Sequence, residues 1–472
     1  MDVEDERSAE QSSDPQDATG PGLAHSLSGI IEFAAVVVFL AAATTFAIVT
    51  PPGGAPDEAG HVVYARAVSH GVMPTPSPVT ETTIRGSHVV YNSAQAHHPP
   101  LWYAIVGGIY ALTGYQEGLL TPIGRILNIL AGLAALLLVR AAMHRAFPRH
   151  PLAIAAGLMI AVASPTFTFV MGSFNNDPLA VLAVCASMYV AVRALQSPRP
   201  VRWLLVLGVV LGAGLLAKLT AAVIVASLLA AGVGVARRPT PDAWKRAALG
   251  TVGGLAIAGV MIAPWLVRNY LLVGTATFNC APRTGLFGSM AEVIWQPSAT
   301  WLATGLGVEE IIAGLWWPDW LLREYHTLLA DLFVGGFIGP DTRPVWMILL
   351  PLAIGVAGLV GVARRMRAMD RQEPDMTQRH VLWMMIFIPI IATLGILHQA
   401  FLVDAHILRW AGRYIPVMMP SIGMVIALGV ARLLPERWRT ALPVAATLAA
   451  AGLNGWAVFR IMRLYETWRP GR

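Results

Sequence analysis

Residues 28–49 read SGIIEFAAVVVFLAAATTFAIV, and this apolar run sets the class of the protein. A transmembrane helix needs about 20 consecutive apolar residues. Its one acid, Glu32, is expected at the level of the lipid headgroups. In the whole 472-residue chain 56% of residues are hydrophobic and 13% are charged, whereas soluble domains carry roughly 25% charged residues. The composition excludes a soluble enzyme and predicts an all-α polytopic membrane protein.

Further segments along the chain have the length and composition of membrane spans. The stretch 203–236 is too long for one helix and short for two, so we predict two short helices with Lys218 at the turn. Eleven spans result, within a single domain over 25–472. Besides 28–49 they are 121–141, 151–171, 178–195, 203–217, 219–236, 248–267, 345–363, 381–400, 414–432 and 441–459.

Five basic clusters indicate the orientation. The positive-inside rule places them in the cytoplasm, and eleven spans with an inside N-terminus satisfy it for all five. The net charge of +6 is explained by these loops, so no nucleic-acid partner is expected. The C-terminal tail, with Arg460 and Arg463, would lie outside as an exception. The clusters are Arg140/Arg145/Arg149, Arg193/Arg199/Arg202, Arg237/Arg238/Lys245/Arg246, Arg364/Arg365/Arg367/Arg371/Arg379 and Arg432/Arg437/Arg439.

The segments outside the membrane divide into a tail and two long loops. Residues 1–24 are acidic and rich in Ser, Asp and Gln, which predicts a disordered cytoplasmic tail. The exterior loops 50–120 and 268–343 are expected to carry the function, because loops on a rigid scaffold carry sites. The apolar piece 99–113 is short for a span, so we predict a helix at the outer interface. Similar surface helices are predicted at 57–70 and 320–333.

The first exterior loop begins PPGGAPDEAGH, in which prolines and glycines end one helix and Asp57 and Glu58 open another. Neighbouring carboxylates at a membrane surface can act as a general base or hold a divalent cation. The alternative is that they only cap the helix, since an acid near a helix start is stabilising by itself.

Other ionisable residues lie at membrane depth, where they are costly and often functional. Asp177 lies in GSFNNDPLAV between two spans, with N-capping before Pro178 as the alternative. Lys218 has no acid nearby in sequence, so it either binds an anionic group or snorkels to headgroups. Arg268 and Arg413 stand at outer span ends, where interface anchoring is the alternative. In the predicted topology these residues share one membrane face, which suits an anionic lipid-linked ligand and a base.

Motifs for zinc, nucleotide or dinucleotide binding are absent from the sequence. His97 and His98 could be ligands, but no third partner stands at metal-ligand spacing. The chemistry therefore depends on the order of the features rather than on a single motif.

That order resembles the GT-C superfamily of membrane glycosyltransferases, and most closely a branch of uncharacterised bacterial polytopic proteins. The matching pieces are PDEAGH, HHPPLWY, RILNILAG, SFNNDPLAV, GAGLLAKLT, APWLVRNYLLVG and GRYIPVMMP. The resemblance implies sugar transfer from a polyprenyl-phosphate donor, with Asp57 or Glu58 as catalytic base. It also implies a second acid at the site, Asp177, which with Asp57 could hold Mg²⁺ or Mn²⁺. The residues expected to bind the donor are Lys218, Arg268, Arg413, Tyr414, His97 and His98.

Two alternatives from other functional classes stay open. A transporter or lipid flippase would show interrupted helices in two matching halves, and the sequence shows one interruption, at Lys218. A non-catalytic cell-envelope assembly protein could have kept the fold. The large C-terminal exterior domain of the best-known GT-C members is missing here, so the acceptor stays unassigned.

Overall fold

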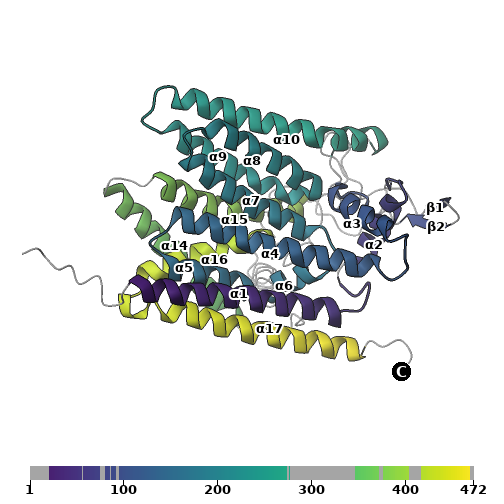
Figure 1. The fold of residues 1–472 in the computed structure, drawn as a ribbon, viewed down its shortest axis with the longest axis horizontal. Coiled ribbons are helices and arrows are strands. Elements are labelled where there is room, and N and C mark those ends of the chain that lie inside the picture. The colour runs from purple at the N-terminus through teal and green to yellow at the C-terminus, as the bar shows by residue number, and fades with distance from the viewer. Residues whose placement is uncertain are drawn as a thin grey trace, which may run out of the picture.

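The computed structural model describes residues 21–55, 57–74, 80–84, 87–91, 95–273, 276, 346–371, 376–402 and 416–467. Long helices run side by side through most of the molecule, and a group of shorter elements lies at one end (Figure 1).

The helices of the bundle are α1 (Pro21–Val49), α4 (Leu120–Ala146), α5 (Pro151–Val162), α6 (Pro165–Gly172), α7 (Asp177–Gln196), α8 (Pro200–Ala217), α9 (Ile224–Ala236), α10 (Ala243–Val273), α14 (Trp346–Arg371), α15 (Met376–Leu402), α16 (Met419–Leu433) and α17 (Ala441–Thr467). Two short 3₁₀ turns, η3 (Leu219–Val223) and η7 (Glu436–Trp438), precede α9 and α17. The smaller elements are α2 (Glu58–Ser69), β1 (Thr80–Ile84), β2 (Ser87–Tyr91) and α3 (Leu101–Leu112).

Each of the eleven predicted spans coincides with helix, and the multi-pass architecture is confirmed. In the described ranges eight helices are long and apolar enough to cross a membrane, and a bent pair makes a ninth. Helix α14 is not among the eight, and α16 belongs to the shorter apolar helices. The number of eleven stays a prediction.

The bent pair corrects the predicted straight span at 151–171. Helices α5 and α6 meet at 66°. Ser164 adopts an extended conformation between them, and its hydroxyl accepts a hydrogen bond from the Phe167 amide at 3.3 Å. Pro165 follows at the first helical position and cannot continue the hydrogen bonding of α5. The sequence therefore starts a new helix within the span.

The predicted break at Lys218 is confirmed. Helix α8 ends at Ala217, Lys218 is extended with φ −161° and ψ 136°, and η3 starts directly afterwards. Close contacts between small residues hold α8 against its neighbour α10, because a Cβ on Gly208 would meet the main chain of Gly254.

Polar contacts bring predicted basic loops together at one end of the bundle. Arg238, after α9, donates hydrogen bonds to the main chain of Ala194 at the end of α7. Arg365 on α14 lies 5.3 Å from the ring centre of Phe147, after α4, and donates to Gln378 on α15. These clusters share an end as the eleven-span topology requires, and its cytoplasmic location stays a prediction.

Glu32 is buried against α4 near the start of α1. It is 3% exposed, and its two oxygens contact Arg140 Nε and His144 Nε2 of α4, both at 2.6 Å. These partners lie more than a hundred positions along the chain, and the location of Glu32 at the headgroup level stays a prediction. The pair joins α1 to α4 at the basic end.

The opposite end carries α2, α3 and the hairpin β1–β2 (Figure 1). Helices α2 and α3 confirm that helices form at 57–70 and 99–113, and their location at the membrane interface stays a prediction. The segment 320–333 lies outside the described residues. The antiparallel hairpin, with Thr80 opposite Tyr91, is an addition to the expected all-α fold. Helix α17 also finishes at this end, opposite the start of α1. The predicted tail 1–24 lies mostly outside the described residues.

Candidate functional site

Asp57 stands immediately before α2 in an unusual backbone conformation. Its φ of 61° and ψ of 0° lie in the left-handed region, which non-glycine residues rarely occupy. Asp57 is the N-cap residue of α2, but its side chain is exposed and makes no capping hydrogen bond. Of the helix-cap alternative, only the favourable effect of a negative charge at the helix start is left. Strained positions of this kind persist when the surroundings impose them, and they gather at functional sites.

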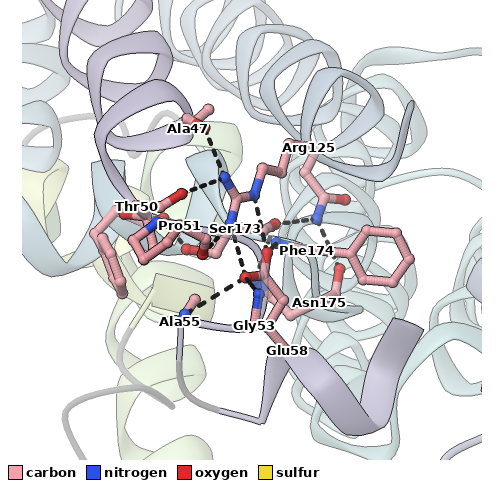
Figure 2. Close-up of polar contacts among 12 residues, drawn as sticks. Ala47, Thr50, Pro51, Gly53, Ala55, Glu58, Arg125, Ser173, Phe174 and Asn175 are labelled. Carbon is pink, nitrogen blue, oxygen red and sulfur yellow. Dashed lines mark hydrogen bonds and ion pairs between the residues drawn. The ribbon is translucent and has the colours of Figure 1, made fainter. Parts of the chain in front are cut away.

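The next residue, Glu58, is completely buried and surrounded by donors (Figure 2). Oε1 accepts hydrogen bonds from Arg125 Nε at 2.9 Å and from the Phe174 amide at 3.1 Å. Oε2 accepts from Arg125 Nη2 at 2.7 Å, from the Gly53 amide at 2.9 Å and from the Ala55 amide at 3.4 Å. With both oxygens engaged and no exposure, Glu58 is suited to hold structure, and the geometry favours Asp57 as the base.

Arg125 of α4 extends this network to the end of α1. Its Nη1 donates to the carbonyls of Ala47 and Thr50, both at 2.7 Å, and Nη2 donates to that of Pro51 at 3.1 Å. The last carbonyls of a helix have no hydrogen-bond partner within the helix. Here the guanidinium of Arg125 donates hydrogen bonds to carbonyls at and just after the end of α1. The network thus fixes the end of α1, the start of α2 and the turn at Phe174 relative to one another (Figure 2).

Arg125, in the segment RILNILAG, is the residue of this network that the sequence analysis does not single out. A lone arginine one turn inside an apolar span needs a buried partner, and that signal could have identified it.

Asp177 and Lys218 form an ion pair, which corrects the expectation that no acid neutralises Lys218. The lysine Nζ lies 2.7 Å from each carboxylate oxygen, and the side chains of Lys218 and Asp177 are 8% and 14% exposed. Asp177 is the first residue of α7 and not its N-cap, a position that Asn176 occupies without a side-chain capping hydrogen bond. The partners are distant in sequence, and the break after α8 brings Lys218 to the start of α7.

A cluster of aromatic and histidine side chains joins α2 to α3. Tyr103 is fully buried; its hydroxyl lies 2.7 Å from His61 Nδ1, and its ring stacks on Tyr64 at 3.7 Å. His98 stacks on His61 at 5.5 Å and contacts the ring of His97 at 3.9 Å. The two predicted histidines therefore belong to this cluster.

The electrostatics of Tyr103 relate the cluster to both candidate acids. Burial raises the pKa of Tyr103 well above its usual value, and the charges of Tyr64, Asp177 and Asp57 raise it further. The phenol therefore stays protonated in its hydrogen bond with His61. The carboxylates of Asp57 and Asp177 both act electrostatically on the buried Tyr103 hydroxyl. The two acids therefore lie in the same region of the structure.

Arg268 reaches the same end from α10. Its Nη2 donates to the carbonyl of Pro74 at 2.7 Å, and its guanidinium lies 5.0 Å from the ring centre of Trp265. The charge of Arg268 also acts on Tyr64. Burial raises the pKa of the Tyr64 phenol, and the positive charge of Arg268 offsets part of this rise. The predicted donor-binding residues Arg413 and Tyr414 lie outside the described residues.

The described side chains do not fit the expected Mg²⁺ or Mn²⁺ held by Asp57 and Asp177. Lys218 occupies both oxygens of Asp177. Within the described ranges no group of three or more His, Cys, Asp or Glu residues is placed to hold a metal ion. We therefore assign Asp57 and Asp177 separate roles.

Comparisons with known proteins bear on the family and the fold. Residues 97–267 match the family described as dolichyl-phosphate-mannose-protein mannosyltransferase. The fold is similar to that of an oligosaccharyltransferase from Archaeoglobus fulgidus in its apo form, with a TM-score of 0.52 and 14% identity over 91% of this chain and 56% of that chain. The same protein with zinc and sulfate gives a TM-score of 0.51 and 15% identity over 90% and 52% of the two chains.

A weaker similarity links the chain to ArnT from Cupriavidus metallidurans bound to undecaprenyl phosphate, with 16% identity, a TM-score of 0.35 and coverage of 86% and 77%. No curated protein matches the chain. The chain spans about half the length of the archaeal oligosaccharyltransferase that it resembles. The family match and the shared fold confirm the resemblance to the GT-C superfamily.

Proposed function

From this resemblance to GT-C glycosyltransferases, we propose that the protein transfers a sugar from a polyprenyl-phosphate donor to an acceptor at the membrane face that carries α2 and α3. The match to a mannosyltransferase family over residues 97–267 supports the reaction class. The predicted orientation makes this the extracytoplasmic face. The sugar and the acceptor are left open.

Asp57 is the proposed base. Its carboxylate takes the proton of the acceptor hydroxyl while that oxygen forms a bond to the anomeric carbon of the sugar. The bond between this carbon and the donor phosphate oxygen breaks, and polyprenyl phosphate leaves with the electron pair. A single displacement inverts the anomeric configuration.

The observation that carries the proposal is the contrast between adjacent acids. Glu58 is buried and bound to Arg125, whereas Asp57 is exposed at the head of α2 in a left-handed conformation. A base must reach a substrate proton, and of the two only Asp57 is exposed. The buried pair holds Asp57 in place without competing for the proton.

Arg268 is the stronger candidate for the donor phosphate. Lys218 already balances Asp177, so this pair brings little net charge to the site. Arg268 donates to a main-chain carbonyl and lies half-buried at the exterior end of α10. A guanidinium can bind a phosphate through two parallel hydrogen bonds and stabilise the charge that grows on it during transfer.

The test is transfer in proteoliposomes with synthetic polyprenyl-phosphate sugars, with nucleotide sugars as the control donor. We expect a glycosylated product of inverted configuration from the lipid-linked donors only. Because the acceptor is open, release of polyprenyl phosphate is measured beside product formation. Transfer from nucleotide sugars alone, or product with retained configuration, would contradict the proposal.

A transporter or flippase stays as the second candidate, because the described residues contain one interrupted span, made of α5 and α6. The break at Lys218 lies between two spans rather than within one. Interrupted helices are common at transporter binding sites. The same proteoliposomes separate the two functions: a flippase moves the labelled lipid between leaflets and leaves the phosphate–sugar bond intact.

A further inference from the structure

Arginines from four parts of the chain act electrostatically on one histidine at the end of the bundle away from Asp57. His150 lies in the short connection between α4 and α5 and is partly buried. Arg149, Arg365, Arg432 and Arg439 all act on it electrostatically. These four, called the arginine cluster below, come from the α4–α5 loop, α14, the last turn of α16 and the residue after η7.

Contacts fix the cluster at the ends of packed helices. Arg365 lies 5.3 Å from the ring centre of Phe147, whose carbonyl accepts a hydrogen bond from the His150 amide at 3.0 Å. Arg439 contacts Glu436 at 3.1 Å, which supplies one negative charge. The helices that carry or adjoin these residues form a chain of packed neighbours, in which α16 packs against both α14 and α5, and α5 packs against α17.

The local potential is strongly positive. Burial and then the four arginines lower the pKa of His150 to about 4, and every charge named as acting on it is a cation. The imidazole is therefore neutral at physiological pH, and it can donate a hydrogen bond to an anion. Arg439 also has a buried Nε without a hydrogen-bond partner among the described residues. The single negative charge of Glu436 does not balance the positive charges of the four arginines.

Apolar surface adjoins the cluster on the membrane side. Val444 and Leu448 are exposed on the first turns of α17, and Leu359 and Val360 are exposed about two turns before Arg365 on α14. In a membrane-spanning helix such side chains face lipid tails. An anion at the cluster that also carried acyl chains would therefore contact apolar side chains next to it.

We propose that the arginine cluster is a binding site for the phosphate headgroup of an anionic phospholipid in the adjoining leaflet. The forked guanidinium groups match phosphate oxygens, and exposed Arg149 and Arg432 are accessible to the headgroup. The acyl chains lie along the exposed apolar residues of α14 and α17. This site is separate from the proposed transfer site at the other end of the bundle.

The test measures binding of phosphatidylglycerol to the purified full-length protein in detergent, with phosphatidylcholine of the same acyl chains as the neutral lipid. We expect preferential binding of phosphatidylglycerol. A basic residue near an anionic headgroup contributes roughly fivefold to affinity. The double variant Arg149→Gln/Arg432→Gln is thus expected to weaken binding by about 25-fold.

The matched control is Arg199→Gln/Arg246→Gln, which removes two exposed arginines, one just before α8 and one in the first turn of α10. It should change affinity by less than about twofold, because neither residue is among the charges that act on His150. An equal loss in both double variants would show a general positive surface and overturn the proposal. So would unchanged binding in the cluster variant, equal binding of phosphatidylcholine, or full competition by an equal concentration of inorganic phosphate.

Discussion

Replacing Glu58 by glutamine tests whether the carboxylate beside Asp57 holds structure. The substitution preserves shape but removes the charge that balances Arg125, whose side chain is 7% exposed. It also turns an amide group toward donors, because Glu58 accepts from Arg125 and from the amides of Gly53, Ala55 and Phe174. Breaking a buried ion pair by removing one partner costs about 3–5 kcal/mol.

The assay is thermal unfolding of purified protein in detergent. For Glu58→Gln we expect the Tm to fall by on the order of 10 °C, with a smaller yield of folded protein. The double variant Glu58→Gln/Arg125→Met should lose less than the sum of the two single variants, since the pair acts as a unit. A wild-type Tm for Glu58→Gln, or strictly additive losses, would refute the structural role.

Three further predictions follow from charged groups in the structure. Lys218→Met should destabilise the protein by about 3–5 kcal/mol, because it leaves the Asp177 carboxylate buried without its positive partner. Adding Asp177→Asn should restore most of the Tm. A wild-type Tm for Lys218→Met would show that the pair is not formed. Arg268→Met should raise the KM for the polyprenyl-phosphate donor more than it lowers kcat, and an unchanged KM would exclude it from donor binding. In the unfolded chain the His150 imidazole gains a proton below pH about 6.5, whereas in the folded protein its pKa is about 4. Stability is therefore lost as the pH falls from about 6.5 towards 4. His150→Gln should flatten the dependence of Tm on pH between 7 and 5, and a pH dependence identical to that of wild type would contradict this prediction.

Most of the helical architecture could be predicted from sequence, because spans are local features. An apolar run of sufficient length must satisfy its own backbone hydrogen bonds in lipid, and it does so as a helix. The break at Lys218 was also readable, since a charge interrupts an apolar stretch there. The bend at Ser164 was missed because a proline at that place is compatible with a continuous span.

The site was harder to predict because its partners are distant in sequence. Asp57 and Glu58 look equivalent in the string PDEAGH, and only the fold shows that Arg125 binds one of them. Likewise, Lys218 has no acid near it along the chain, but the start of α7 supplies Asp177. Buried ion pairs connect elements that lie far apart in the sequence. The sequence could therefore identify these residues as candidates, but it could not predict which residue contacts which.

The central claim is that Asp57 takes the acceptor proton while Glu58 only holds the site together. The most direct measurement is the initial rate of sugar transfer by Asp57→Asn in proteoliposomes, at an amount of folded protein matched to wild type by gel filtration and Tm. Losing a general base costs about 10²–10⁴-fold in rate, so we predict a loss of that size with an unchanged Tm. Transfer by Asp57→Asn at the wild-type rate would contradict the account.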